Sequence, residues 1–392
     1  MFRAVTRLAM RHPPHPPSSS TAAASSSTVL VRSYPKTTVV TLNREAALNS
    51  LNDDMIQSLR GFYATVHDIV EPDSTLIVLK GAGTKAFCAG GDVVSLVKDE
   101  PRGTRASFFY NEYQVNNMIA TMKQPQVSLW NGVVMGGGFG VSIHGRYRMA
   151  TESTVFAMPE TGIGLFPDVG GSFVLPRLRA IEGLGLYLGL TGARLKGADV
   201  FHAGLANCYV RTQAQLAEVV QKLCSLEDVK QVDSILAHAT AESGVHDVPF
   251  TLAKHAVAIQ KYFGDHHRGI ADVFATLAAA DTSDAFAHKT LSTLTKCSPL
   301  AICATFKLLR HGATLPNVTT AFEFEYNATQ HLMASKDFNS GVTALLIDKS
   351  ASPPRWEHSS ISEVPECDGM LERRSDAVAW HPTRPFPGSA KL

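Results

Sequence analysis

Short runs of β-branched and aliphatic residues recur along the first half of this 392-residue chain, and they constrain its fold more than any other feature. Such residues pack well on the pleated surface of a β-sheet, and runs of four to eight of them are typical of buried strands. The pattern predicts strands over Thr37–Leu42, Thr75–Leu79, Val127–Trp130, Arg148–Thr151 and Val155–Met158.

Segments with helical spacing lie between these strands. Asn52 can cap a helix, because its side-chain oxygen can accept a hydrogen bond from a free N–H group of the first turn. The apolar residues that follow recur every three or four positions: Met55, Leu59, Phe62, Val66 and Val70. Phe108–Met122 is a second predicted helix. Strands that alternate with helices predict an α/β domain.

The second half of the chain loses the strand signal beyond about Thr212. Helices are predicted over Leu252–Tyr262, Ile270–Ala279, Leu300–Leu309 and Thr319–Met333, with a late linker at Lys349–Pro354. We therefore divide the chain into a core over residues 34–212 and a mostly helical C-terminal region over residues 213–392.

The N-terminal segment has the composition of a mitochondrial presequence. No Asp or Glu precedes Glu45, whereas six Arg or Lys residues and a stretch rich in Ser, Ala and Thr do. Acid-poor, Arg-rich and Ser-rich N-termini are typical of import signals. We predict that residues 1–33 are a disordered presequence, cleaved near Arg32–Tyr34, and that the protein is located in the mitochondrial matrix. An ordinary disordered tail is the alternative.

The overall charge argues against nucleic acid as a partner. The 36 Lys and Arg residues nearly balance the 35 Asp and Glu residues, so the chain lacks the basic surplus that nucleic-acid binding needs.

Gln124–Gly145 has no charged side chain, but a proline and several glycines interrupt it. We predict a strand, a tight turn and a buried helix there, and no membrane span. The six cysteines form no Cys-x-x-Cys pair, which argues against a zinc ribbon.

Three glycine-containing segments carry the chemistry: Lys85–Asp92, Trp130–Gly140 and Met158–Gly171. Each places glycines beside a predicted strand end or helix start. A residue without a Cβ atom lets a ligand approach the backbone closely, and free N–H groups at a helix start can stabilise an oxyanion. A single glycine cluster more often marks a tight turn, so only the three together indicate a site.

Together, and at these spacings, the three segments resemble the crotonase (enoyl-CoA hydratase/isomerase) superfamily over about Thr37 to Val210. More narrowly, Met158–Gly171, Asn111–Tyr113, Leu195–Val200 and Asp337–Lys349 resemble its acyl-CoA thioester hydrolases, which extends the resemblance to nearly the whole mature chain. The resemblance implies a crotonase ββα spiral core, with the C-terminal helical region packed over or beside it.

The resemblance also implies the site residues. The backbone N–H groups of Gly91 and Gly137 would hold the thioester carbonyl oxygen as an oxyanion hole. Glu160 is implied as the catalytic acid, base or nucleophile, Asp168 as the acid specific to the hydrolases, and Glu112 as a carboxylate that contacts substrate. A mostly apolar pocket would raise the pKa of Glu160, which suits proton transfer near neutral pH.

Each of the three acidic residues also has an ordinary structural interpretation. From the residues alone, Glu160 also fits a carboxylate at a helix start, Asp168 a turn residue, and Glu112 a solvated helix charge. Hydratases of the superfamily carry a second catalytic Glu at the position of Gly140. A glycine there removes one of the two acids that hydration needs, and it favours hydrolysis.

We therefore expect an acyl-CoA thioester hydrolase that acts on a short 3-hydroxyacyl-CoA, above all on 3-hydroxyisobutyryl-CoA of valine catabolism. CoA is part of the substrate, and neither a metal nor a redox cofactor is expected. The alternatives are an enoyl-CoA hydratase or isomerase and a catalytically idle crotonase-fold subunit of a mitochondrial assembly. The sequence leaves open the acyl-chain preference and whether Glu160 attacks the substrate or activates water. It also leaves the oligomeric state open, with a homo-oligomer as one of the alternatives.

Overall fold

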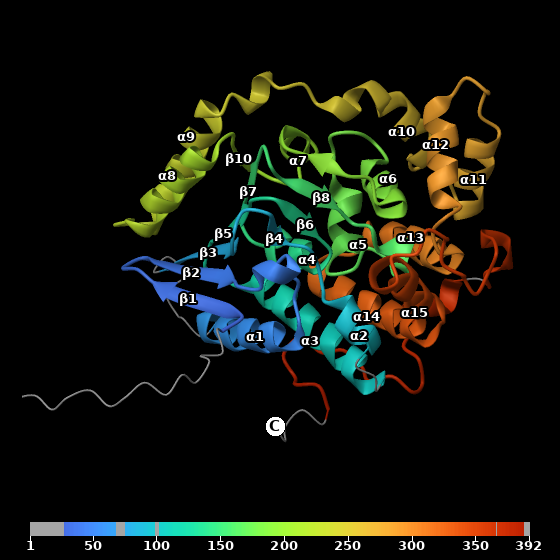
Figure 1. Ribbon diagram of the computed structural model, residues 1–392, viewed down its shortest axis with the longest axis horizontal. Helices are drawn as coiled ribbons and strands as arrows, with labels where there is room; N and C mark the ends of the chain where they lie inside the picture. Colours follow the sequence, from blue (N-terminus) through green and yellow to red (C-terminus); the bar gives the residue numbers. More distant parts are fainter. Residues whose placement is uncertain (1–26, 68–74, 99–101, 366, 388–392) are drawn as a thin grey trace, which may run out of the picture.

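The computed structural model describes residues 27–67, 75–98, 102–365 and 367–387, which are built around two β-sheets (Figure 1). The larger sheet has six strands in the order β1-β2-β3-β5-β7-β10, and the smaller has four in the order β4-β6-β8-β9. The larger sheet contains β1 (Val29–Ser33), β2 (Thr37–Leu42), β3 (Leu76–Gly81), β5 (Gln126–Trp130), β7 (Tyr147–Thr151) and β10 (Cys208–Val210). The smaller sheet contains β4 (Ala86–Cys88), β6 (Val133–Met135), β8 (Val155–Ala157) and β9 (Leu195–Lys196).

The chain winds through the two sheets as a spiral, and each turn adds one strand to each sheet. The pairs β3/β4, β5/β6 and β7/β8 follow one another, and neighbouring turns pair in parallel in both sheets. A helical segment follows each pair: α2 (Val93–Lys98), α4 (Gly137–Ile143) and the 3-10 helix η3 (Glu160–Ile163). Because parallel strands end at the same edge of a sheet, the loops after β4, β6 and β8 lie together.

The strand β3 shows why short apolar runs form the centre of this fold. Its consecutive residues Leu76, Ile77, Val78 and Leu79 are all fully buried. Ile77 and Leu79 join the main core, whereas Leu76 and Val78 join a second apolar cluster on the opposite face of the sheet. A strand that is covered on both faces has no need of polar alternation, which explains its continuous apolar sequence.

The helices of the first half match their sequence signals. Helix α1 (Asp53–His67) begins after Asn52, whose side-chain oxygen accepts a hydrogen bond from Met55 N–H at 3.1 Å. Val70, the last apolar position of the predicted stripe, lies outside the described residues. Helix α3 (Arg102–Thr121) packs against α1 and α4 and carries Glu112.

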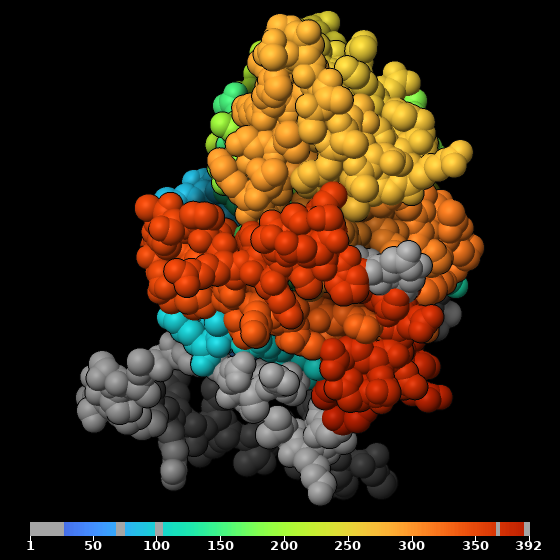
Figure 2. Space-filling model, turned by 90° about the vertical axis from the view of Figure 1, so that its right-hand side faces the viewer, coloured from blue at the N-terminus to red at the C-terminus, as the bar shows by residue number. Residues whose placement is uncertain are grey.

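Helices dominate the second half, and among the described residues no strand follows β10. Figure 2 shows one face of the molecule that is covered by these C-terminal segments, drawn in orange and red. The helices in this half and just before it are α5 (Gly171–Val174), α6 (Leu184–Thr191), α7 (Ala198–His202), α8 (Gln213–Cys224), α9 (Val232–Glu242), α10 (Ala256–Phe263), α11 (Ile270–Ala278), α12 (Ala285–Leu294), α13 (Pro299–Gly312), α14 (Val318–Ala334) and α15 (Asp337–Val342). No helix of the described ranges is long and apolar enough to cross a membrane.

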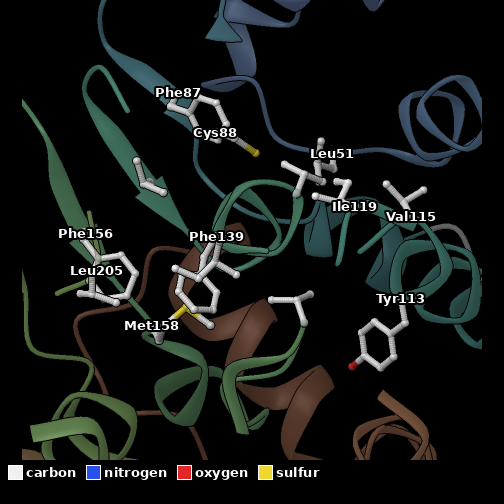
Figure 3. Packing of buried hydrophobic residues seen from close by; sticks show 14 of the residues in the cluster. Leu51, Phe87, Cys88, Tyr113, Val115, Ile119, Phe139, Phe156, Met158 and Leu205 are labelled. Carbon is white, nitrogen blue, oxygen red and sulfur yellow. The ribbon is translucent and has the colours of Figure 1, made fainter. Parts of the chain in front are cut away.

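The C-terminal helices share a core with the spiral. Ala304 of α13 and Phe322 of α14 belong to the same apolar cluster as Phe139 of α4 and Phe156 of β8. The rings of Phe139 and Phe156 lie 5.6 Å apart, and Met158 packs beside them (Figure 3). The helical region therefore completes the core of the spiral and closes one side of it.

The expected N-terminal boundary differs from the structure at one strand. We expected disorder through residue 33, but Val29–Ser33 forms β1, which pairs antiparallel with β2 from Val29↔Leu42 to Ser33↔Thr38. Val29 is buried, whereas Leu30 and Val31 are exposed on this edge strand. Cleavage near Arg32–Tyr34 would remove β1. Residues 1–26 lie outside the described residues, so the presequence stays a prediction.

We expect a chain that begins at Tyr34 to be less stable than one that begins at Ser27. The shorter chain loses the burial of Val29 and uncovers the edge of β2, and burying a valine side chain is worth about 1.5–3 kcal/mol. Urea unfolding of the two purified chains measures the difference. Equal midpoints would show that β1 does not contribute to stability.

Candidate active site

A cavity of about 840 Å³ opens where the loops after β4, β6 and β8 meet. This size is usual for a small-molecule site. Leu345 and Leu346 of the short π-helix η8 (Thr343–Ile347) lie at its wall together with Arg194 and Lys349. The cavity is lined by all five residues that the sequence predicts for the site: Gly91, Gly137, Glu112, Glu160 and Asp168.

The two predicted oxyanion-hole residues come from neighbouring turns of the spiral. Leu51 N–H donates to Gly90 O and Asp92 N–H donates to Leu51 O, each at 2.8 Å, which fixes the backbone on both sides of Gly91. Gly137 is the first residue of α4, where an amide has no acceptor within the helix. A Cβ atom on Gly137 would lie 3.2 Å from Gly91 N, so these two amide groups lie close together. Such preorganised N–H donors can stabilise a developing oxyanion.

Carboxyl oxygens approach the backbone of two glycines more closely than a Cβ atom there would allow. A Cβ atom on Gly137 would lie 2.4 Å from Glu112 Oε1, and one on Gly136 would lie 2.9 Å from Glu160 Oε1. Gly136 also has a φ of 43°, a conformation that residues with a Cβ atom rarely adopt. The glycine cluster therefore brings two acids against the amide groups.

Three acidic side chains reach the cavity from three separate elements. Glu112 lies on α3, Glu160 begins η3, and Asp168 precedes α5; their residues are 2%, 6% and 4% exposed. Glu112 Oε1 and Glu160 Oε2 are buried without a hydrogen-bond partner in the described structure. Buried polar atoms are normally paired, so these two oxygens are available to groups of a substrate.

Burial perturbs the acidity of all three groups. It raises the pKa of Glu112 and of Glu160 well above the ordinary range, and the negative charge of Asp168 adds to both effects. Burial also raises the pKa of Asp168 to about 7, although the hydrogen bond from Tyr113 opposes this. The three groups therefore carry fewer than three negative charges near neutral pH. A carboxyl group with a pKa near 7 is well suited to proton transfer.

A network that sequence reasoning missed surrounds Asp168. The hydroxyl of Tyr113, a fully buried residue of α3 seen in Figure 3, donates to Asp168 Oδ2 at 2.8 Å. His144 Nε2 lies 2.9 Å from Val169 O, and burial lowers the pKa of His144 to about 4. The ring is therefore neutral, and Nε2 carries the donated proton. Glu325 of α14 contacts the next residues of the turn.

The position of Gly140 has no room for a second acid. A Cβ atom there would lie 2.6 Å from Val169 Cβ and 2.9 Å from Asn116 Nδ2. The turn after Asp168 therefore occupies the space that a longer side chain at position 140 would need.

Within the described ranges, no three His, Cys, Asp or Glu side chains are placed to hold a metal ion.

The chain is similar in sequence to curated proteins of one kind. The profile of the Enoyl-CoA hydratase/isomerase family matches residues 37–370. A protein of Xenopus laevis named "3-hydroxyisobutyryl-CoA hydrolase, mitochondrial" is 40% identical over 84% of this chain and 84% of its own length. The protein of the same name from Danio rerio is 41% identical over 88% of this chain and 90% of its own length.

A solved structure shares the architecture. The carnitinyl-CoA dehydratase from Mycobacterium thermoresistibile superposes with a TM-score of 0.80 at 30% sequence identity, covering 91% of this chain and 99% of its own. The predicted crotonase fold is confirmed by this match and by the strand pairing described above.

We expect Gly140→Ala to destabilise the fold, because its Cβ atom would lie 2.6 Å from that of Val169. Overpacking of this kind costs about 1–3 kcal/mol. Gly61→Ala is the matched control: nothing lies within 4 Å of a Cβ atom there, and alanine favours the helix. Urea unfolding compares both variants with the wild type. Wild-type stability in Gly140→Ala would show that the site has spare room.

We expect Asp168→Asn to gain stability over the wild type as the pH rises from 5 to 7. Because the pKa of Asp168 is about 7 in the fold but about 3.9 when unfolded, ionisation costs the native state more than the unfolded chain. That cost is absent below the unfolded pKa and complete above the folded one, and asparagine never incurs it. Unfolding free energies at pH 5, 6, 7 and 8 measure the difference, which a pH-independent offset would contradict.

Proposed function

The chain belongs to the enoyl-CoA hydratase/isomerase family, and we propose that it hydrolyses short 3-hydroxyacyl-CoA thioesters, with 3-hydroxyisobutyryl-CoA as its substrate. One observation carries the proposal. Glu160 lines the same cavity as the two oxyanion-hole glycines and approaches Gly136, the neighbour of Gly137, whereas the place of a second hydratase acid is closed at Gly140. The printed names of the Xenopus laevis and Danio rerio relatives support the same activity.

The reaction begins when the thioester carbonyl oxygen accepts hydrogen bonds from the amides of Gly91 and Gly137. These donors stabilise the negative charge that develops on this oxygen as the carbonyl carbon becomes tetrahedral. The amides are fixed by the backbone bonds around them, so little reorganisation is needed when the charge appears.

Glu160 can serve in either of two routes. In one, its carboxylate attacks the carbonyl carbon, the C–S bond breaks, and the CoA thiolate leaves and takes up a proton; water then hydrolyses the resulting anhydride. In the other, Glu160 removes a proton from a water molecule that attacks the same carbon directly. Both routes yield the free 3-hydroxy acid and CoA.

Asp168 and Glu112 line the same cavity and assist the reaction. We assign to Asp168 the positioning of water or of the substrate 3-hydroxyl, since Tyr113 fixes one of its oxygens and its pKa of about 7 lets it accept or donate a proton. Glu112 lies beside Gly137, where its unpartnered oxygen can bind a polar group of the acyl chain.

Hydration or dehydration is the second candidate, because the similar structure from Mycobacterium thermoresistibile is titled a dehydratase. Addition of water to a double bond uses two acids, and the crowding at Gly140 argues against the second one. The idle-subunit alternative lacks an observation in its favour, since all three acids line the cavity.

We place this activity in mitochondria, as the names of both curated relatives state for those proteins, and specifically in the matrix. The acid-poor N-terminal composition supports import. The proposed reaction uses carboxylates, backbone amides and water, so we propose that it needs no metal or redox cofactor.

We expect Glu160→Gln to release CoA from 3-hydroxyisobutyryl-CoA at least about 10²–10⁴-fold more slowly than the wild type, because the amide is neither a base nor a nucleophile. Glu152→Gln is the matched control, since Glu152 is exposed and does not line the cavity. A thiol-release assay on both purified variants tests this. Wild-type turnover in a folded Glu160→Gln variant would refute the assignment.

A further inference from the structure

The turn that carries Asp168 has a strained backbone. Val169 has a φ of 52°, in the left-handed region that β-branched residues avoid, and Gly170 follows with a φ of 87°. Such conformations persist only where the surrounding structure holds them, and they concentrate at functional sites. The orientation of Asp168 therefore depends on the groups that hold this turn.

Glu325 of α14 is the main group that does so. It is fully buried, and its two carboxylate oxygens both bond to the turn. Oε2 accepts the N–H of Gly170 at 2.7 Å, while Oε1 accepts the N–H and the hydroxyl of Ser172 at 2.9 and 2.5 Å. Burial raises the pKa of this carboxyl group to about 8, while the three hydrogen bonds, which all come from one short segment, oppose that rise.

The next turn of α14 also reaches Asp168, through Tyr113. Thr329 lies one helical turn after Glu325, and its hydroxyl lies 2.9 Å from that of Tyr113. Tyr113 in turn donates to Asp168 Oδ2. The carboxyl group of Asp168 is thus fixed through Tyr113, and its backbone is fixed through Glu325.

We propose that Glu325 is a positioning residue for hydrolysis: it holds residues 168–172 so that the Asp168 carboxyl group points into the cavity. Glu325 itself does not line the cavity, whereas Asp168 does. The inference rests on the proposed function, and it adds a residue that acts through Asp168 without touching the substrate. A merely structural role, in which Glu325 only fastens α14 to α5, is the competing explanation.

The test is a double-mutant cycle on the full chain with 3-hydroxyisobutyryl-CoA. Glu325→Gln keeps the size of the side chain but replaces one acceptor oxygen with a donor. We expect kcat to fall on the order of 10- to 100-fold, because small misplacements of catalytic groups have effects of this size, while KM changes less than about threefold. In the Asp168→Asn background the same change should cause no further loss, since residues that act as a unit are not additive.

A matched control separates this effect from general damage. Asp199 of α7 is also buried and accepts the backbone N–H of Thr251 at 2.8 Å and its hydroxyl, but it does not line the cavity. Asp199→Asn should leave kcat unchanged.

If Glu325→Gln does not fold, Ser172→Ala is the second variant. It removes only one of the three hydrogen bonds, so it should lower kcat less than Glu325→Gln would. In the Asp168→Asn background it should lower kcat no further.

Two results would overturn the inference. One is an unchanged kcat in folded Glu325→Gln, or in Ser172→Ala where that variant replaces it. The other is a loss of kcat that multiplies in full with that of Asp168→Asn. A wild-type chain that hydrolyses no 3-hydroxyacyl-CoA would instead refute the proposed function, so the two failures can be told apart.

Discussion

The close approach of two carboxyl groups to the backbone at Gly136–Gly137 is the constraint on which the rest of the site depends. Glu112 and Glu160 can come this near only because both positions lack a Cβ atom. The parallel pairing of β4, β6 and β8 makes the approach possible, since it places their following loops at one edge. The result is a site in which acids and free amide groups meet without intervening side chains.

That arrangement lowers the stability of the fold, and packing of the C-terminal helices offsets this loss. Burial raises the pKa of three acids, and Val169 adopts a left-handed backbone conformation; both features oppose folding. Helices α13 and α14 bury apolar side chains in the same core as the spiral. Proteins often accept such local strain where activity requires it.

The sequence predicted most of the central strands to within one or two residues, because their apolar runs reflect burial on both faces. The site residues were reached through motif spacing. Four of the missed strands, β4, β6, β9 and β10, have three residues or fewer and form only by pairing with their neighbours. The five-residue β1 was missed because it lies in the segment whose composition predicted a disordered presequence. Glu325 was missed because its role is tertiary. The sequence did contain a signal for Glu325. It lies on the same apolar face of a helix as Ala321, Ala328 and Leu332, where a carboxyl group needs hydrogen-bond partners.

The most direct test of the hydrolase assignment compares two reactions of one wild-type preparation. Thiol release from 3-hydroxyisobutyryl-CoA measures hydrolysis, and loss of the double bond of crotonyl-CoA measures hydration. With one of the two hydration acids missing, we expect hydrolysis to be faster by at least about 100-fold in kcat/KM. Hydration of crotonyl-CoA at an equal or greater kcat/KM would contradict the assignment.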